Sequence, residues 1–450
     1  MSARSAALIA ALITVCALFF RVSYVRNTVV ENPIRSDARQ YLVYASNLAE
    51  RGVFSKQLSE APEPDSFRSP GYPLLVALTL KVAGDGRPPE QNAFYPVLLH
   101  LQAVLGALMV PLTFALGTRF LPRWAALVAA GGVAMSPHLV TLGGYILTET
   151  LFGVLALAAI LTFVLALERD SPRLCSGAGA LFGLAALTNA TILMVPFGFA
   201  IAAVIAQGER IGSPAWKRRL RRVVLFLAAF CVLPAAWSVR NALSVSEHAR
   251  TGADRAFATM THGIYPGWVH RDPRFRYYAY YDDERADEIR SSLSGFASVL
   301  WQRARERPLR YASWFLLEKP YYGWSWSILQ GAGDVFVYPV RTSLFQVSKL
   351  ADATRLFMKA LHPLLLLAVC AGIPLCLGRA LYLRGSALLV ETPVLLALFA
   401  LYYTAIFVVF APWPRYGVPL RPELYLLATW SALELCGALI ARLRPAERAP

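Results

Sequence analysis

The residues from Ala6 to Phe20 read AALIAALITVCALFF, and two polar stretches follow them, SDARQY from Ser36 to Tyr41 and FRSPGYP from Phe67 to Pro73. The segment from Ala6 to Phe20 contains no charged side chain and predicts the core of a membrane-spanning helix. Ionisable side chains close to a bilayer are costly, so a carboxylate and an arginine placed just outside the first helix are candidates for function. This order indicates a membrane protein that does chemistry at the membrane surface.

The composition points to the same class. Of the 450 residues, 56% are hydrophobic and 16% are charged, with a mean hydropathy of +0.47, whereas a soluble domain carries roughly 25% charged residues. The N-terminus resembles a signal peptide but lacks a clear small-x-small cleavage site, so we expect an uncleaved first helix. We predict a short interfacial helix at 72–82 and an all-α polytopic bundle of about ten transmembrane helices, near 6–26, 94–118, 123–140, 145–167, 174–188, 190–207, 223–240, 356–378, 388–410 and 416–441.

The positive charge sets the expected orientation. The net charge is +16, and the densest basic run lies between Glu209 and Arg222, flanked by hydrophobic segments. Cytoplasmic loops of membrane proteins carry an excess of Lys and Arg, so we place this run in the cytoplasm. Basic runs beside a membrane ordinarily meet anionic lipid, and we expect no nucleic-acid partner.

With the N-terminus inside, the long segments 27–93 and 241–355 lie outside. We divide the chain into an N-terminal transmembrane catalytic module (1–240), an extracytoplasmic loop with interfacial helices (241–355) and C-terminal transmembrane helices (356–450). The aromatic and acidic run from Tyr277 to Glu284 is typical of a membrane–water boundary. We therefore expect amphipathic surface helices in the second external segment rather than a free globular domain.

Five short motifs place polar or charged residues at the predicted outer ends of the helices. They are SDARQY with Asp37, FRSPGYP with Arg68, TET with Glu149 (148–150), WSVRN with Arg240 (237–241) and PRYGVPLRP with Arg415 (414–422). In this order and placement they resemble the membrane-embedded GT-C glycosyltransferases, above all the protein O-mannosyltransferase-like family (family 39 type), which includes the aminoarabinose transferases of lipid A. The resemblance covers nearly the whole chain.

Asp37 matches the early external carboxylate that serves this family as catalytic base. A sugar hydroxyl is a poor nucleophile, and a positioned carboxylate can take its proton as the new bond forms. The alternative is that Ser36 or Asp37 caps the helix that follows. Some relatives carry an Asp-Glu pair at this position, whereas Asp37 is followed by Ala38, which puts a two-carboxylate role in doubt.

The arginines match positions that would bind the phosphate of a lipid-linked donor. Arginine binds phosphate bidentately, and a lipid phosphate in a low dielectric needs fixed positive charge. The resemblance thus assigns Arg68, Arg240 and Arg415 to donor phosphate. The alternatives are that Arg68 and Arg415 are interface anchors and that Arg240 complements a helix dipole. Where relatives often show Thr-Lys, this chain has Thr188-Asn189, so one positive charge of the family pattern is missing.

Glu149 matches a family Thr-Glu at the outer start of a helix and would support the site, either by contacting the donor sugar, holding a water or orienting Asp37. The alternative is a structural carboxylate paired with a basic residue. No cofactor is required. A divalent cation is an option, although no histidine spacing suggests a metal site and all six cysteines fall in apolar runs. Weaker candidates for contact with substrate or acceptor are Tyr41, Tyr72, His262 and Tyr416.

The resemblance implies an inverting glycosyltransferase of the bacterial cytoplasmic (inner) membrane, with its active site on the extracytoplasmic face. It would move a sugar from a polyprenyl-phosphate donor to an acceptor hydroxyl on a lipid, an envelope glycan or a protein. The rival interpretations are a transporter or flippase of lipid-linked glycans, a non-catalytic membrane assembly subunit, and an O-antigen-ligase-like enzyme. A transporter should carry polar residues at mid-membrane depth, where the predicted helices of this chain are nearly free of them.

Overall fold

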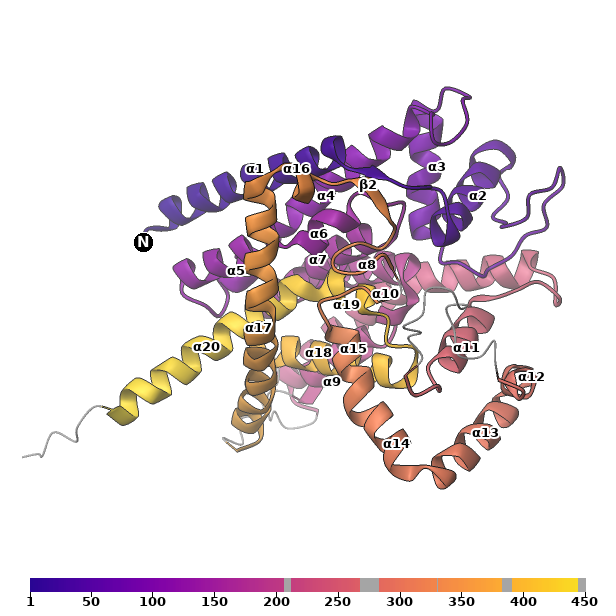
Figure 1. The fold of residues 1–450 in the computed structure, drawn as a ribbon. Coiled ribbons are helices and arrows are strands. Elements are labelled where there is room, and N and C mark those ends of the chain that lie inside the picture. Colours follow the sequence, from indigo (N-terminus) through magenta and orange to yellow (C-terminus); the bar gives the residue numbers. More distant parts are fainter. Residues whose placement is uncertain (206–211, 268–282, 330, 383–390, 444–450) are drawn as a thin grey trace, which may run out of the picture.

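The computed structural model describes residues 1–205, 212–267, 283–329, 331–382 and 391–443, and most of these residues form a bundle of helices (Figure 1). Within these ranges, seven segments are long and apolar enough to cross a membrane. They are α1 (Ala3–Asn27), α4 (Phe94–Gly117), α7 (Glu149–Glu168), α10 (Pro214–Ser244), α17 (Lys349–Tyr382), α18 (Thr392–Val409) and the run of α19 (Pro414–Gly417), η5 (Val418–Leu420) and α20 (Arg421–Leu443).

The predicted polytopic all-α class is confirmed, and each of the ten expected spans coincides with a helix. Three of them coincide with helices that are not among the seven long apolar segments: α5 (Arg123–Met135), α8 (Pro172–Thr188), and the pair of η1 (Ala190–Ile192) and α9 (Val195–Ile205). The expected helix over 123–140 is wrong at its end, because α6 (Pro137–Leu142) begins as a separate helix. Pro137 lacks an N–H and forces the preceding residue, Ser136, into an extended conformation (ψ 109°).

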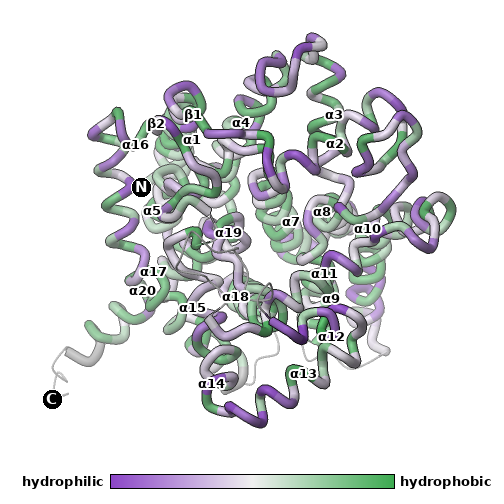
Figure 2. Tube along the Cα trace, turned by 45° about the vertical axis from the view of Figure 1, so that its right-hand side comes forward, coloured by the Kyte–Doolittle hydropathy of each residue, from purple (hydrophilic) through white to green (hydrophobic). Residues whose placement is uncertain are grey.

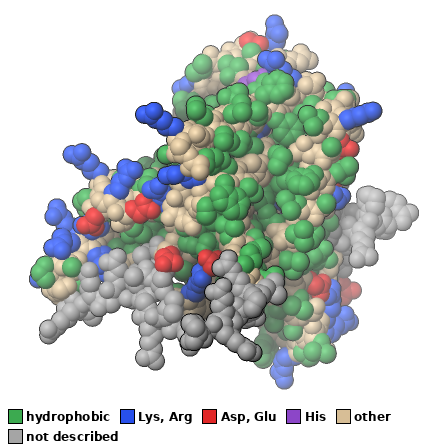
Figure 3. Space-filling view, turned by 90° about the vertical axis from the view of Figure 1, so that its left-hand side faces the viewer, with side chains coloured by type: hydrophobic (Ala, Val, Ile, Leu, Met, Phe, Trp, Pro, Cys, Tyr) green, Lys and Arg blue, Asp and Glu red, His purple; other side chains and the backbone are tan. Residues whose placement is uncertain are grey.

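The centre of the bundle is apolar. Hydrophobic residues run along α4, α7 and α18, whereas α2 (Ser36–Arg51) and α12 to α14 carry more hydrophilic residues (Figure 2). Helices α8 and α10 pack closely because α8 presents glycine to its neighbour: a Cβ on Gly179 would lie 2.1 Å from the carbonyl oxygen of Phe226. On the face formed by the left-hand side of Figure 1, hydrophobic side chains cover the centre and most Lys and Arg side chains stand at the margins (Figure 3).

Short helices make up the two predicted external segments. In the first, α2 is followed by α3 (Gly71–Ala83), which confirms a helix at 72–82. In the second, the described helices are α11 (Gly252–His262), α12 (Ala286–Ser291), α13 (Leu293–Glu306), α14 (Pro308–Ser313), a π-helical turn (Trp314–Glu318), α15 (Lys319–Trp324) and α16 (Leu344–Val347). Most of the predicted boundary run, Tyr277 to Asp282, lies outside the described residues.

A two-stranded sheet joins the two predicted external segments, and no sequence pattern predicted it. Strand β1 (Val29–Val30) pairs antiparallel with β2 (Val340–Thr342). Nearby, the Ser66 amide donates to the carbonyl of Arg250 at 3.3 Å. Segments that exchange backbone hydrogen bonds lie on one side of the bundle, as expected if both are external.

Candidate active site

Asp37 lies in the first turn of α2, where the chain enters the helix through an unusual backbone conformation. Ser36 has a φ of 47°, in the left-handed region that L-residues seldom occupy. The preceding residue, Arg35, makes no side-chain cap hydrogen bond. The carboxylate of Asp37 does not cap the helix either and instead forms ion pairs with Arg68 and Arg415. The helix-cap alternative therefore does not describe Asp37.

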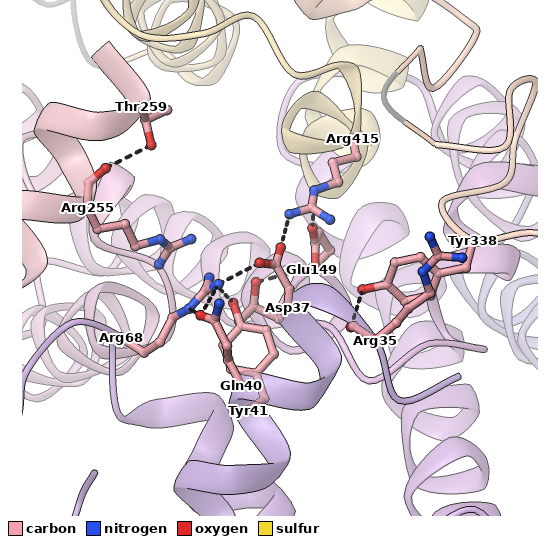
Figure 4. A network of polar contacts seen from close by, with 11 residues as sticks. Arg35, Asp37, Gln40, Tyr41, Arg68, Glu149, Arg255, Thr259, Tyr338 and Arg415 are labelled. Atoms are coloured by element: carbon pink, nitrogen blue, oxygen red, sulfur yellow. Dashed lines mark hydrogen bonds and ion pairs between the residues drawn. The ribbon is translucent and has the colours of Figure 1, made fainter. Parts of the chain in front are cut away.

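Arg68 contacts three side chains of α2: Asp37, Gln40 and Tyr41. Its side chain is 4% exposed, and its Nη2 lies 2.5 Å from Oδ1 of Asp37. Its Nε donates to Oε1 of Gln40 at 2.8 Å, and its Nη1 donates to the Tyr41 hydroxyl at 3.2 Å. Because Gln40 and Tyr41 follow Asp37 on the same helix, one face of α2 holds the guanidinium in place (Figure 4). Arg68 is a buried site residue and not an exposed interface anchor.

Arg415 joins the two carboxylates that the sequence singled out. It forms an ion pair with Oδ2 of Asp37, and its Nε lies 3.6 Å from Oε1 of Glu149. Glu149 begins α7, is 3% exposed and accepts a hydrogen bond from the Thr148 hydroxyl at 3.3 Å. Arg415 belongs to α19, at the other end of the chain. The network thus draws residues from the first and the last of the three predicted segments.

The arginines keep Asp37 ionised. Burial alone would raise the pKa of its carboxyl group, but the positive charges of Arg415 and Arg68, with a smaller effect from Arg255, hold that pKa well below its ordinary value. The Asp37 side chain is still 21% exposed. A charged carboxylate that solvent can reach is in a suitable state to accept a proton from a substrate hydroxyl.

Arg255 is a site residue that the sequence reasoning missed. It lies on α11, and its guanidinium points toward Arg68 and Asp37 (Figure 4). Within the part of the chain that the structure describes, this guanidinium forms no hydrogen bond or ion pair, and it acts on Asp37 through its charge. The two carboxylates balance Arg68 and Arg415, so Arg255 gives the group an excess of positive charge. A capping box at Thr251 and Asp254 predicts the helix start, but no motif indicates the direction of Arg255.

Arg240 does not join this network. Its guanidinium donates to the backbone carbonyls of Asp65, at 2.8 Å, and Phe54, at 3.2 Å, and stacks on the Trp237 ring at 4.9 Å. These contacts tie the first external segment to the end of α10. The structure thus places Arg240 where it positions the loop that carries Arg68, and its predicted contact with phosphate stays a prediction.

Gly71 connects two of the sequence motifs. The segment after Arg68 enters α3 at Gly71, where an added Cβ would lie 2.7 Å from Oγ1 of Thr188 and 2.9 Å from the carbonyl oxygen of Leu187. The FRSPGYP motif therefore packs directly against the end of α8. Asn189, which follows there, accepts a hydrogen bond from the Thr191 amide at 3.2 Å and caps η1.

The weaker candidates lie at different depths. Tyr41 contacts Arg68, and Tyr416 lies beneath Arg415, with 5.2 Å from the guanidinium to its ring centre. Tyr72 is fully buried and donates to Gln102 at 2.8 Å, so it supports the site from below. His262 ends α11, where burial and the charge of Arg290 lower its pKa to about 4. At neutral pH its imidazole is uncharged.

The described residues contain no group of three or more His, Cys, Asp or Glu side chains arranged to hold a metal ion. At the site itself, both carboxylates face Arg415. A divalent cation between Asp37 and Glu149 would have to displace that guanidinium. The donor set is therefore better suited to binding an anionic group than to binding a metal.

Comparison with known proteins finds a family match over part of the chain. Residues 68–237 match the dolichyl-phosphate-mannose-protein mannosyltransferase family. An oligosaccharyltransferase structure from Archaeoglobus fulgidus, tethered to an acceptor peptide, matches with a TM-score of 0.50 at 13% identity, over 99% of this chain and 51% of that chain. The family match covers 170 of the 450 residues, and the likeness to the oligosaccharyltransferase shows a shared fold. The matched region begins at Arg68 and contains Glu149.

Two other solved GT-C proteins are similar. The protein O-mannosyltransferase complex Pmt1-Pmt2 of S. cerevisiae, bound to its sugar donor, has 18% identity and a TM-score of 0.42, over 56% of this chain and 36% of that chain. ArnT from Cupriavidus metallidurans, bound to undecaprenyl phosphate, has 15% identity and a TM-score of 0.35, over all of this chain and 82% of that one. The chain spans between a third and about half of the length of the first structures that it matches. No curated protein matches it.

Proposed function

We propose that this GT-C protein transfers a sugar from a polyprenyl-phosphate donor to an acceptor hydroxyl on the extracytoplasmic face of a bacterial cytoplasmic membrane. The observation that carries the proposal is the ionised Asp37 held between Arg68 and Arg415 in a bundle of apolar helices. A carboxylate for the acceptor and guanidinium groups for the leaving phosphate are the two parts that this transfer needs. The family description names a dolichyl-phosphate-linked mannose; the sugar and acceptor of this chain are to be found by experiment.

In the proposed step, the acceptor oxygen attacks the anomeric carbon of the donor while Asp37 accepts the hydroxyl proton. The bond between the anomeric carbon and the phosphate oxygen breaks, and the lipid phosphate leaves with the bonding electrons. Attack from the side opposite the phosphate inverts the anomeric centre. The protein contributes position and electrostatic stabilisation, because phosphate is already an adequate leaving group.

When the donor binds, Arg68 and Arg415 would contact both the donor phosphate and Asp37. In the structure, Asp37 occupies both Arg68 and Arg415. A donor phosphate that enters beside Arg255 would compete with Asp37 for those guanidinium groups. As the phosphate takes them, the pKa of Asp37 rises toward the ordinary range of a carboxyl group, and the carboxylate becomes a stronger base. Glu149 would retain Arg415 near the site throughout.

The test compares strains in which the gene is deleted and then complemented with wild type, Asp37→Asn or Glu63→Gln. Glu63 is an exposed carboxylate in the same external segment, so its substitution removes the same charge away from the site. Mass spectrometry of the envelope glycans and of the polyprenyl-phosphate sugars gives the readout, with the protein level measured in each strain.

We expect the deletion and Asp37→Asn strains to lack one glycan and to accumulate its lipid-linked donor, while Glu63→Gln restores the wild-type profile. That result would also name the sugar and the acceptor. If Asp37→Asn restores the wild-type profile at equal protein level, the assignment of Asp37 as base is wrong. A transport role or a non-catalytic assembly role would then take its place.

A further inference from the structure

A charged cavity lies away from the Asp37 site. It has a volume of about 280 Å³ and lies between α7, α8, α9 and the start of α10. Its floor is apolar, with the buried side chains of Phe163, Val223 and Phe226. Its rim carries arginines from the densest basic run of the sequence. The cavity is about nine times larger than the roughly 30 Å³ that one water molecule takes up in the liquid.

The basic run is divided between two faces of α10. Arg218, Arg219 and Arg222 line the cavity, whereas Lys217 and Arg221 do not. This division follows from helical geometry, because residues three and four apart share a face. Among the described residues that line the cavity, one is acidic: Asp170, which pairs with Arg222. This described lining thus carries three positive charges and one negative charge around an opening with an apolar floor.

Two helices place this cavity at the opposite end of the bundle from the Asp37 site. On α7, Leu167 lines the cavity and Glu149 lies in the site. On α10, Arg222 lines the cavity and Arg240 contacts the first external segment. Both pairs are 18 residues apart in the sequence, roughly 27 Å at 1.5 Å per residue. This is close to the roughly 30 Å thickness of a bilayer's hydrocarbon core.

We infer that this cavity binds the phosphate headgroup of an anionic phospholipid from the leaflet opposite the Asp37 site. The arginines supply charge-assisted donors to the phosphate oxygens. The apolar floor lies under the glycerol region. Outside the cavity, α9 and α10 expose Ile201, Ile205 and Val224, which give acyl chains an apolar surface. A soluble anion would leave that floor and that surface uncovered. The inference is independent of the reaction at Asp37.

The experiment uses the full chain, purified in detergent and stripped of lipid. Phosphatidylglycerol, phosphatidylcholine or inorganic phosphate is added at matched concentrations. The melting temperature and the lipid that stays bound in native mass spectrometry are measured. We expect phosphatidylglycerol to stabilise the protein at a concentration about tenfold lower than phosphatidylcholine, because one net charge-assisted contact of about 1.4 kcal/mol corresponds to a factor of ten.

Two variants with equal loss of charge test the location. The double variant Arg218→Gln/Arg219→Gln changes the cavity, and Lys217→Gln/Arg221→Gln removes the same charge from the other face of α10. We expect only the first to weaken phosphatidylglycerol binding, by about tenfold or more. The variant Ala215→Phe reduces the volume of the cavity without changing its charge and should also weaken phosphatidylglycerol binding. It tests the same location if Arg218→Gln/Arg219→Gln does not fold.

Three results would overturn the inference. Equal weakening by both double variants would show that phosphatidylglycerol responds to diffuse surface charge. Equal stabilisation by inorganic phosphate and phosphatidylglycerol would show that the ligand is a soluble anion. Undiminished phosphatidylglycerol binding in Ala215→Phe together with undiminished binding in Arg218→Gln/Arg219→Gln would show that the lipid binds elsewhere.

Discussion

Replacing Arg415 with glutamine should shift the titration of Asp37 to higher pH. In wild type, Arg415 and Arg68 hold the pKa of Asp37 well below its ordinary value, so this carboxylate is ionised at neutral and mildly acidic pH. We therefore expect kcat/KM of wild type to lack an acidic limb from Asp37. The variant Arg415→Gln removes one of the two ion-pair partners of that carboxylate.

The size of the change follows from the geometry. Two unit charges about 4 Å apart near a protein surface attract each other by roughly 4 kcal/mol, and each pKa unit corresponds to about 1.36 kcal/mol, so complete loss of the pair is equivalent to about three units. The Asp37 side chain is 21% exposed, and water screens part of this attraction. We expect a rise of about one to three units in the pKa of Asp37, as is typical of a carboxylate that loses an arginine neighbour.

The assay measures kcat/KM against pH for donor transfer by the purified protein, with Arg240→Gln as the control. Arg240 contacts backbone carbonyls of the first external segment and not Asp37, so its variant should keep the wild-type pH profile even if its rate falls. A pH profile of Arg415→Gln that coincides with the wild-type profile down to the lowest pH at which both proteins stay folded would refute the reasoning. It would mean that Asp37 is not the titrating base or that Arg415 does not pair with it in solution.

Three further outcomes are expected. Arg255→Gln should raise KM for the donor about tenfold, since a contact with a charged group contributes about 1.5 kcal/mol, and Arg250→Gln, which changes an exposed arginine outside the network, should leave KM unchanged. Gly71→Ala should destabilise the protein by about 1–3 kcal/mol and lower its melting temperature, because the new Cβ would meet Thr188 and the carbonyl of Leu187. Lys319 is fully buried with its Nζ 2.6 Å from the Val408 carbonyl oxygen, and burial lowers its pKa to about 7. The unfolded chain binds the additional proton between about pH 7 and pH 10, so stability should rise with pH across this window, and Lys319→Met should abolish the rise in melting temperature.

The sequence predicted the parts of the structure that depend on local pattern. Apolar runs of sufficient length fixed the positions of α1, α4 and α7, because a bilayer requires about 20 such residues. The pairing of Asp37 with Arg68 and Arg415 involves three of the motifs that the sequence singled out, and Glu149 comes from a fourth. Their predicted placement at the same ends of the helices was enough to expect that they share a site.

Other features depend on contacts that no local pattern records. The motif that contains Arg240 resembled a phosphate-binding position, but its side chain reaches the carbonyls of Asp65 and Phe54 in a loop more than 170 residues earlier. Arg255 approaches Asp37 only because α11 packs against the first external segment. The pairing of β1 with β2 involves two and three residues, too few for a recognisable strand pattern.

The distance along the chain between Asp37 and Arg415 has a consequence for biosynthesis. These partners are 378 residues apart, and a ribosome that adds about 5–20 residues per second needs roughly 20–80 s to travel from one to the other. During this interval the nascent protein holds Asp37 with Arg68 alone, and Glu149 has not yet met its guanidinium. A chain released before α19 would keep most of its membrane helices but lack the cation that joins both carboxylates. A site in which one guanidinium joins both carboxylates would therefore exist only on finished molecules, and under the proposed function the donor would meet it only there.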